Sequence, residues 1–457
     1  MLNSQEIALR LERILPQVQK PGRYVGGEYN QIVKKWEAVA TRVALAFPDI
    51  YDIGLPNLGL AIFYEQLNAR QDVLAERVYC PWIDMESHMR AERIPLFSLE
   101  SQRPIIDFDI LAITLPYETL FTNTLNLLDL AGIPLKSSQR GANHPLVIAG
   151  GHACYNPEPM ADFIDAFVIG EGEEVIEEIV DTYQAWKRTG QDRQSLLLAL
   201  ATIPGVYIPA FYKPHFQPDG TMERIERLDS NVPASITKRI LAKLPPAPSH
   251  FLVPNIEVVH NRISVEIMRG CTRGCRFCHA GMINRPVRER SIDEIVETLQ
   301  TALDSTGFEE IALLSLSSSD YTRITDLVDA VTTRFAGKNL VVSLPSLRIE
   351  SFSVDLMEKL KGSRQGGFTL APEAATERMR TIINKPISTE QLLETARAIY
   401  SRGWPMIKLY FMIGHPDETL EDVLAITDLC KAVLAEGRRT IGGRAQVHAG
   451  VSTFIPK

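Results

Sequence analysis

Three cysteines occupy one short stretch of the chain at C-x-x-x-C-x-x-C spacing. They are Cys271, Cys275 and Cys278, in the stretch Arg269-Gly-Cys-Thr-Arg-Gly-Cys-Arg-Phe-Cys-His279. Three thiolates on one loop can hold three corners of a cubane iron–sulfur cluster, whereas a fully closed cluster takes four. The other three cysteines lie more than a hundred residues away in the sequence. The spacing therefore predicts a [4Fe-4S] cluster whose fourth iron is left open to a substrate.

A zinc site is the alternative for the same residues. Cys3His is an ordinary tetrahedral zinc set, and His279 would complete it. Zinc sites usually pair two separated groups of ligands, whereas these four candidates fall within nine residues. The charge around them also favours a cluster, because residues 261–290 carry seven arginines against two glutamates. Cationic neighbours compensate an anionic, thiolate-ligated group.

The composition is that of a globular protein with more than one domain. The chain has 457 residues, 45% of them hydrophobic, and a formal net charge of -8, which argues against broad nucleic-acid binding but leaves a local basic site for RNA open. No apolar run has the length of a membrane span, and the polar start lacks the regions of a signal peptide. With three of six cysteines in one motif, we expect a cytoplasmic protein without disulfides.

Short apolar runs alternate with amphipathic segments over residues 1–187. This alternation predicts a doubly wound, Rossmann-like α/β domain, which binds ligands at the carboxyl ends of its parallel strands. The expected strands are 42–47, 77–80, 110–115, 146–149 and 166–169, and the expected helices are 4–18, 57–69, 84–92, 119–131 and 173–187.

Proline-rich residues 188–258 are expected to form a linker with a β-ribbon. Residues 259–457 then read as six βα units, which predict an open (β/α)6 partial TIM barrel with its catalytic face at the carboxyl ends of the strands. The expected strands are 263–268, 310–316, 340–344, 367–370, 407–412 and 446–454, and the expected helices are 292–304, 322–335, 353–361, 389–402 and 418–436.

With the aromatic Phe277 directly before the third cysteine, and a strand before the loop, this stretch resembles the signature of the radical S-adenosylmethionine superfamily. The resemblance implies that the open iron chelates the amino and carboxylate groups of S-adenosylmethionine. It implies reductive cleavage to methionine and a 5'-deoxyadenosyl radical, with an external electron donor of the flavodoxin or ferredoxin type. The cofactor carries the hard chemistry and the protein positions it.

The same resemblance assigns roles to residues at the strand ends. Ser317 and Ser318 stand where relatives contact the methionyl amino group. The relatives carry a small-residue or Gly-Gly-Glu stretch at this place, and this chain has serines instead. Arg348 would pair the methionyl carboxylate, and Glu373 would accept the ribose hydroxyls. Gly414 would let the backbone lie against adenine. For each of these residues, a purely structural role in a turn or in barrel packing is the alternative.

Two turns in the first domain resemble those of the cobalamin-binding domains that precede many barrels of this superfamily. They contain Gly150, Gly151 and His152 after one strand and Gly170 and Gly172 after the next. Small residues there would let a corrin approach the backbone. The alternative is a Rossmann-like scaffold that binds no corrin.

The loop 49–54 departs from the pattern of cobalamin-dependent mutases. Its sequence Asp-Ile-Tyr-Asp-Ile-Gly has no histidine where Asp-x-His-x-x-Gly would supply a lower axial ligand. Cobalamin-dependent radical enzymes often lack this histidine, so the sequence leaves open whether cobalamin binds.

Over nearly the whole chain, the order of domains resembles that of uncharacterised radical S-adenosylmethionine proteins with a cobalamin-binding-like amino-terminal domain. The resemblance implies C–H activation, with methyl transfer as the sequel if cobalamin binds and methylthio transfer or rearrangement as the alternatives if it does not. A non-catalytic iron–sulfur scaffold or electron-transfer protein is the alternative. The sequence indicates neither the substrate nor further catalytic residues.

The last expected strand, 446–454, has no helix after it. An unpaired parallel edge with apolar residues such as Val451 and Phe454 invites association. We expect a continuing polypeptide, a partner protein or a second copy to close the barrel there.

Overall fold

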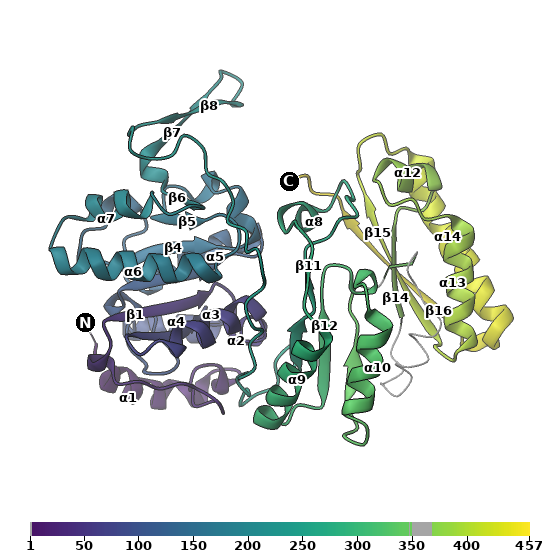
Figure 1. Cartoon of the computed structure of the whole chain (residues 1–457), viewed down its shortest axis with the longest axis horizontal. Helices are drawn as coiled ribbons and strands as arrows, with labels where there is room; N and C mark the ends of the chain where they lie inside the picture. The colour runs from purple at the N-terminus through teal and green to yellow at the C-terminus, as the bar shows by residue number, and fades with distance from the viewer. Residues whose placement is uncertain (1, 347, 350–367) are drawn as a thin grey trace. The chain divides into compact units, whose positions relative to one another are not determined.

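The computed structural model describes residues 2–346, 348–349 and 368–457. The chain divides into two compact units, Met1–Asn261 and Arg262–Lys457 (Figure 1). Residues 188–258, expected as a linker, therefore belong to the first unit. In the part of the chain that is described, no helix combines the length and the apolar character needed to cross a membrane.

A six-stranded sheet forms the centre of the first unit, in the order β2-β1-β3-β4-β5-β6. Its first five strands in the chain are parallel and β6 is antiparallel, which confirms the expected parallel, Rossmann-like elements. The strands are β1 (Thr41–Phe47), β2 (Val73–Tyr79), β3 (Ile110–Thr114), β4 (Leu146–Gly150), β5 (Ala166–Val168) and β6 (Val206–Tyr207).

Strand β2 starts four residues before the expected 77–80. The buried charged residues Glu76 and Arg77 interrupt its apolar pattern, which hid the first half of the strand. The guanidinium of Arg77 donates to Glu28 at 2.8 Å and to Glu100 at 2.6 Å, so its charge is compensated inside the core.

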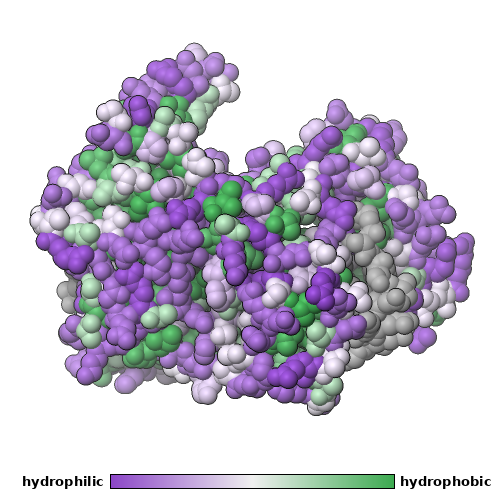
Figure 2. Space-filling model, viewed as in Figure 1, coloured by the Kyte–Doolittle hydropathy of each residue, from purple (hydrophilic) through white to green (hydrophobic). Residues whose placement is uncertain are grey.

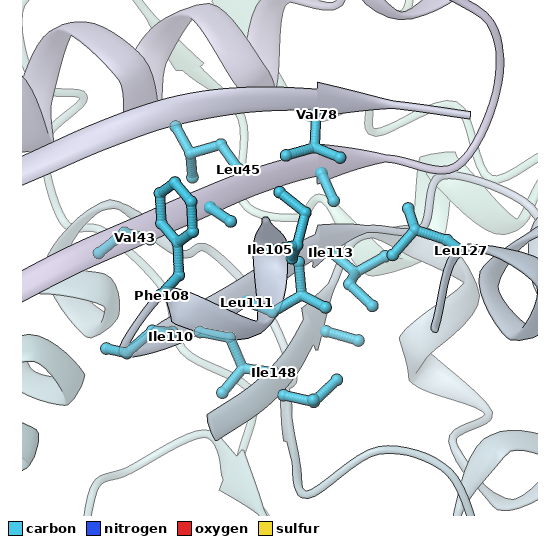
Figure 3. Packing of buried hydrophobic residues seen from close by; sticks show 14 of the residues in the cluster. Val43, Leu45, Val78, Ile105, Phe108, Ile110, Leu111, Ile113, Leu127 and Ile148 are labelled. Atoms are coloured by element: carbon cyan, nitrogen blue, oxygen red, sulfur yellow. The ribbon is translucent and has the colours of Figure 1, made fainter. Parts of the chain in front are cut away.

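Helices cover both faces of this sheet, as a doubly wound fold requires. Helices α3 and α6 contact each other, and an ion pair between Arg90 and Asp129 joins α4 to α5. Apolar side chains from β1 to β4 fill the space between the layers (Figure 3). The helices are α1 (Ser4–Ile14), α2 (Tyr51–Gly54), α3 (Leu58–Ala69), α4 (Ile83–Glu92), α5 (Phe121–Leu130), α6 (Glu173–Thr189) and α7 (Arg193–Leu200).

The stretch 188–258 contains the expected ribbon, which pairs β7 (Tyr212–Phe216) with β8 (Met222–Arg227). Figure 2 shows this ribbon projecting from the first unit with a polar tip. The same stretch also contains α7, which was not expected, and β6, a strand-like run that joins the central sheet and not the ribbon. Helix α7 buries three leucines, and the two-residue β6 extends the sheet beyond β5, so both gain stability from tertiary packing that a local pattern does not reveal.

The second unit contains two three-stranded parallel sheets, in the orders β13-β12-β9 and β14-β15-β16. All six expected strands are present, but the expected helix 353–361 lies outside the described residues. The strands are β9 (Ile263–Glu266), β12 (Glu310–Leu314), β13 (Val341–Ser343), β14 (Phe368–Glu373), β15 (Met406–Ile413) and β16 (Gln446–Thr453).

Helices α13 and α14 cover one face of the β14-β15-β16 sheet, where Ile407, Leu409 and Phe411 are buried (Figure 1). The described helices of this unit are α8 (His279–Ile283), α9 (Ile292–Thr306), α10 (Ile324–Arg334), α12 (Glu377–Ile382), α13 (Thr389–Ser401) and α14 (Leu420–Ile441).

Candidate functional site

The three cysteines lie on a loop whose two ends meet in a short ribbon. The ribbon pairs β10 (Met268–Arg269) antiparallel with β11 (Arg288–Glu289). Gly270 follows β10 with a φ of +90°, and an added Cβ there would lie 2.5 Å from the carbonyl oxygen of Pro286. Only glycine fits both the backbone conformation and this close approach. The cysteine loop, residues 270–287, therefore starts from a fixed crossing of the chain.

Residues around the end of α12 hold the middle of the cysteine loop. The N–H of Arg276 donates to the carbonyl oxygen of Ile383 at 2.9 Å. The side-chain amide of Asn384 donates to two further carbonyl groups of the loop. Phe277 packs against the apolar cluster that contains Met379. The aromatic residue of the motif therefore anchors the loop.

The three sulfurs share one polar environment. All three thiols are free; Cys275 is buried, and Cys271 and Cys278 are partly exposed. Burial raises the pKa of the Cys278 thiol, nearby Cys275 and Cys271 raise it further, and the N–H of Gly281, 3.3 Å from the sulfur, opposes them. A guanidinium nitrogen of Arg348 lies 3.8 Å from the sulfur of Cys275. Cys271 and Cys275 therefore both act electrostatically on the Cys278 thiol.

This donor set fits a cluster bound by three thiolates. The free thiols supply the ligands, while a backbone N–H and a guanidinium stand ready to donate to sulfur, as groups around iron–sulfur clusters do. Across the described residues, no three His, Cys, Asp or Glu side chains are grouped so that they could hold a metal ion. A cubane does not require such a grouping around one ion, because its three thiolates bind different irons.

Ser317 and Ser318 lie beside the cysteine loop, and both are buried. The hydroxyl of Ser317 donates to Asp320 at 2.7 Å, and that of Ser318 donates to the carbonyl oxygen of Pro345 at 2.6 Å. Asp320 also accepts a hydrogen bond of 2.8 Å from Arg273 of the cysteine loop. Burial alone would raise the pKa of Asp320, but Arg273 and Ser317 outweigh it and the pKa is lowered.

Asp320 was not among the residues singled out from the sequence. Its signal there is weak, because it only ends a run of serines. In the fold, the ion pair between Arg273 and Asp320 ties the cysteine loop to the turn after β12.

Glu373 stands at the end of β14, after an irregularity in the register of the sheet. Its backbone is in the left-handed region, with a φ of +66°, which is strained for a residue with a side chain. Its carboxylate accepts a hydrogen bond of 3.0 Å from Lys385, and it raises the pKa of Cys278 because it lies nearby. The fold pairs Glu373 with Lys385, which nothing in the sequence indicated.

Gly414 follows β15 with a φ of +90°, and its N–H donates to Glu418. The next residue, His415, is only 6% exposed. Its ring lies 4.8 Å from the ring of Phe454 and 6.4 Å from that of Phe277, measured between centroids. Among the described residues, its Nε2 atom has no hydrogen-bond partner. A buried polar atom without a partner is costly, so this nitrogen marks a position where a bound molecule would supply one.

The glycine turns of the first unit are shaped by the chain itself. An added Cβ at Gly151 would lie 2.5 Å from the carbonyl oxygen of Leu115, and one at Gly170 would lie 2.3 Å from that of Arg239. Packing of backbone on backbone therefore accounts for both glycines. Gly172 precedes α6, where an added Cβ would lie 2.8 Å from the ring of Phe63.

Gly150 and His152 face a more open environment. An added Cβ at Gly150 would meet only Val168, at 3.8 Å, and His152 is exposed. Gly150 ends β4 and His152 follows it, so both lie at the carboxyl edge of the sheet, together with the partly exposed Tyr117 after β3. Of the expected corrin contacts, Gly150 is the glycine with room for an added Cβ, and His152 is the exposed side chain.

Tyr51 stands where the axial histidine of a cobalamin-dependent mutase would be, and it points into the core. Its side chain is 1% exposed, and its ring lies 5.4 Å from that of Tyr79. Burial raises its pKa, and the nearby carboxylate of Glu28 adds to the effect. The loop 49–54 therefore offers no axial ligand from this position.

Two family models match parts of the chain. Residues 59–209 match the amino-terminal region of radical SAM proteins, and residues 265–430 match the radical SAM superfamily, where SAM is S-adenosylmethionine. The second match contains the cysteine loop, β12 to β15 and part of α14.

Several relatives share this similarity. The uncharacterized protein MJ0966 of Methanocaldococcus jannaschii is 25% identical over 418 residues, which cover 91% of this chain and 77% of that protein. The ribosomal protein uS12 methylthiotransferase RimO of Aliarcobacter butzleri is 22% identical over 35% of the chain. The threonylcarbamoyladenosine tRNA methylthiotransferase MtaB of Treponema pallidum is 21% identical over 39%. The chain covers only 38% of each methylthiotransferase.

A solved structure has a similar fold. It is the radical S-adenosylmethionine methyltransferase TsrM of Kitasatospora setae, determined with cobalamin and a [4Fe-4S] cluster bound. The TM-score is 0.59 with 14% sequence identity, over 90% of this chain and 75% of that protein.

Proposed function

From the membership of this chain in the radical S-adenosylmethionine superfamily, we propose that it cleaves S-adenosylmethionine reductively at a [4Fe-4S] cluster held by Cys271, Cys275 and Cys278. The chain is an enzyme of this superfamily, with an unknown substrate. The observation that carries the proposal is the cysteine loop. It holds three free thiols, and Gly270 and the residues after α12 fix its position.

When bound, the cluster supplies the single electron that splits S-adenosylmethionine into methionine and a 5'-deoxyadenosyl radical for C–H activation. The work of the protein is to hold the thiolates and to balance charge around them. Arg348 places a guanidinium at the sulfur of Cys275, and the N–H of Gly281 points at the sulfur of Cys278. Both donors stabilise negative charge on sulfur.

The residues at the strand ends would hold S-adenosylmethionine. The ion pair with Lys385 fixes the carboxylate of Glu373 near the cysteines, which suits it to accept ribose hydroxyls. Arg348 would pair the methionyl carboxylate. The hydroxyls of Ser317 and Ser318 already donate within the protein, so we assign the contact with the amino group to their backbone or to the remaining lone pairs.

His415 and Gly414 would meet the nucleoside part. Gly414 carries no side chain at the end of β15, where its backbone can lie against adenine. The buried Nε2 of His415 lacks a partner among the described residues, and we assign that partner to S-adenosylmethionine. This arrangement assumes that the strands β9 and β12 to β16 form one partial barrel, which is part of the proposal.

The test is anaerobic reconstitution with iron and sulfide, followed by reduction in the presence of S-adenosylmethionine. We expect about four irons for each chain and the formation of 5'-deoxyadenosine. Replacing Cys271, Cys275 or Cys278 with alanine should remove both, whereas Cys430→Ala, at a half-buried thiol on α14, should change neither. Stoichiometric zinc without iron would overturn the proposal, and a cluster without cleavage would favour a scaffold or electron carrier.

We propose cobalamin as a ligand of the first unit and methyl transfer as the reaction when it binds. The accessible Gly150 and His152 at the carboxyl edge support this, because open parallel sheets bind ligands there. The expected result is that hydroxocobalamin co-elutes with the protein. Gly150→Leu should abolish this retention, whereas Gly141→Leu, in open space on a loop, should not. Wild-type protein that elutes free of corrin would contradict the proposal.

We also propose that another polypeptide strand pairs with the outer edge of β16. Most residues of this strand are exposed, including Val451 at 50%, and no described strand pairs with it on the side away from β15. An external electron donor of the flavodoxin or ferredoxin type is a separate proposal. Monodisperse monomer in sedimentation together with full turnover would argue against the strand partner.

A further inference from the structure

One face of the β14-β15-β16 sheet is left open by its helices. Helices α13 and α14 pack on the face that carries Ile407, Leu409 and Phe411. Successive side chains of a strand point to opposite faces, so Lys408 and Tyr410 lie on the other one. Tyr410 is 48% exposed, although it sits in the middle of the central strand. Tyr410 therefore presents an aromatic ring on the face that these helices do not cover.

The ring of Tyr410 is held against the neighbouring strand. In the parallel register of β15 and β16, Tyr410 stands opposite Gly450, and Lys408 stands opposite His448. An added Cβ at Gly450 would lie 2.7 Å from two ring carbons of Tyr410. Glycine is therefore needed for the ring to lie on the strand, which leaves the other side of the ring accessible.

Lys408 is the charged residue on this face of β15 and β16. On β15 and β16 the positions that share this face include no carboxylate; they are Met406, Lys408, Tyr410, Met412, Gln446, His448, Gly450 and Ser452. Among the residues that the structure describes, Lys408 makes no ion pair, and the same holds for His448. A cation on a partly buried sheet face normally has an anionic partner, so an anionic ligand would complete this one.

We propose that the Tyr410 face, meaning Lys408, Tyr410, His448 and Gly450, binds the substrate, and that the substrate presents a planar aromatic ring bearing a carboxylate or phosphate. The ring would stack on Tyr410, and the anion would lie between Lys408 and His448. This proposal rests on the proposed function. Four residues separate Tyr410 from Gly414 along β15, or roughly 13 Å, which a substrate of moderate size can span toward the cysteine loop.

The test measures binding to the reconstituted full-length protein with oxidised cluster and saturating S-adenosylmethionine, by titration calorimetry. The probes are indole-3-acetate and phenyl phosphate, compared with neutral indole-3-acetamide and with acetate and inorganic phosphate, which lack a ring. We expect at least one aromatic anion to bind ten times more tightly than the neutral ring and than the simple anions. Which of the two binds better identifies carboxylate or phosphate as the anionic group.

Variants assign the binding to this face. Lys408→Met and Tyr410→Ala should each weaken the aromatic anion at least fivefold, whereas Lys431→Met, at an exposed lysine of α14, should not. Iron content and circular dichroism report whether each variant is folded. Equal binding of indole-3-acetamide, or unchanged binding by folded Lys408→Met and Tyr410→Ala proteins, would overturn the proposal. Loss of S-adenosylmethionine cleavage in the wild type would instead refute the proposed function, because probe binding is measured independently.

Discussion

Replacing His415 with phenylalanine is expected to stabilise the cluster-loaded protein and, at the same time, to weaken its binding of S-adenosylmethionine. The imidazole is 6% exposed, and its Nε2 has no partner among the described residues. A buried polar atom left unpaired costs about 1–3 kcal/mol. Phenylalanine removes that cost, but its larger volume strains the packing and cancels part of the gain in stability. We expect the free energy of unfolding to rise by about 1 kcal/mol.

The same substitution should weaken the binding of S-adenosylmethionine. Loss of one hydrogen bond of about 0.5–1.5 kcal/mol raises the dissociation constant about two- to twelvefold. At a ligand concentration of 100 times the wild-type constant, S-adenosylmethionine should stabilise the wild type by about 2.7 kcal/mol. A variant that binds tenfold more weakly should gain only about 1.4 kcal/mol under the same conditions.

The assay is anaerobic urea unfolding followed by circular dichroism, with and without S-adenosylmethionine, and equilibrium dialysis for the dissociation constant. The control is His250→Phe in the first unit, where the side chain is 60% exposed. It should change neither quantity appreciably. A variant at His415 that is less stable than wild type without ligand, or that binds S-adenosylmethionine equally well, would refute the reasoning.

Three further predictions concern the cysteine loop and the core of the first unit. Gly270→Ala should reduce iron incorporation to less than about a tenth, because its Cβ would strike the next pass of the chain; Gly443→Ala, in open space, is the matched control, and equal iron contents would count against the prediction. Arg77→Met should lower the free energy of unfolding by about 3–5 kcal/mol, because two buried carboxylates lose their cation. An unchanged urea midpoint would contradict this. Burial raises the pKa of Glu76, although Ser101 donates a hydrogen bond to its carboxylate. Glu76 therefore keeps its proton to higher pH in the folded state than in the unfolded state. The wild type should lose stability as the pH rises from about 4.3, the pKa of the unfolded state, to the raised pKa of the folded state. Glu76→Gln should lose less over that window in unfolding measurements, and parallel pH profiles would show the reasoning to be wrong.

Local patterns in the sequence determined the elements and the chemistry of the motif. The alternation of apolar runs gives strands such as β1, β3, β4 and β15 close to their expected bounds, because side-chain periodicity and burial are set locally. The C-x-x-x-C-x-x-C spacing likewise predicts three thiolates on one loop, since so few residues between them leave the chain little choice. In β2 the buried charges hide the apolar pattern of the strand. Arg77 pairs there with Glu28 and Glu100, which are distant in the sequence.

Only the tertiary structure decided what surrounds the cysteines. The packing of His415 between Phe277 and Phe454, and the approach of Arg348 to Cys275, join segments far apart in the sequence. No local period encodes such contacts. Tertiary structure also decided the role of Gly151 and Gly170. The sequence suggested them as ligand contacts, whereas in the fold each lies directly against the backbone of another segment. A residue type states what a position can do, and the long-range packing of the chain selects which of those uses is realised.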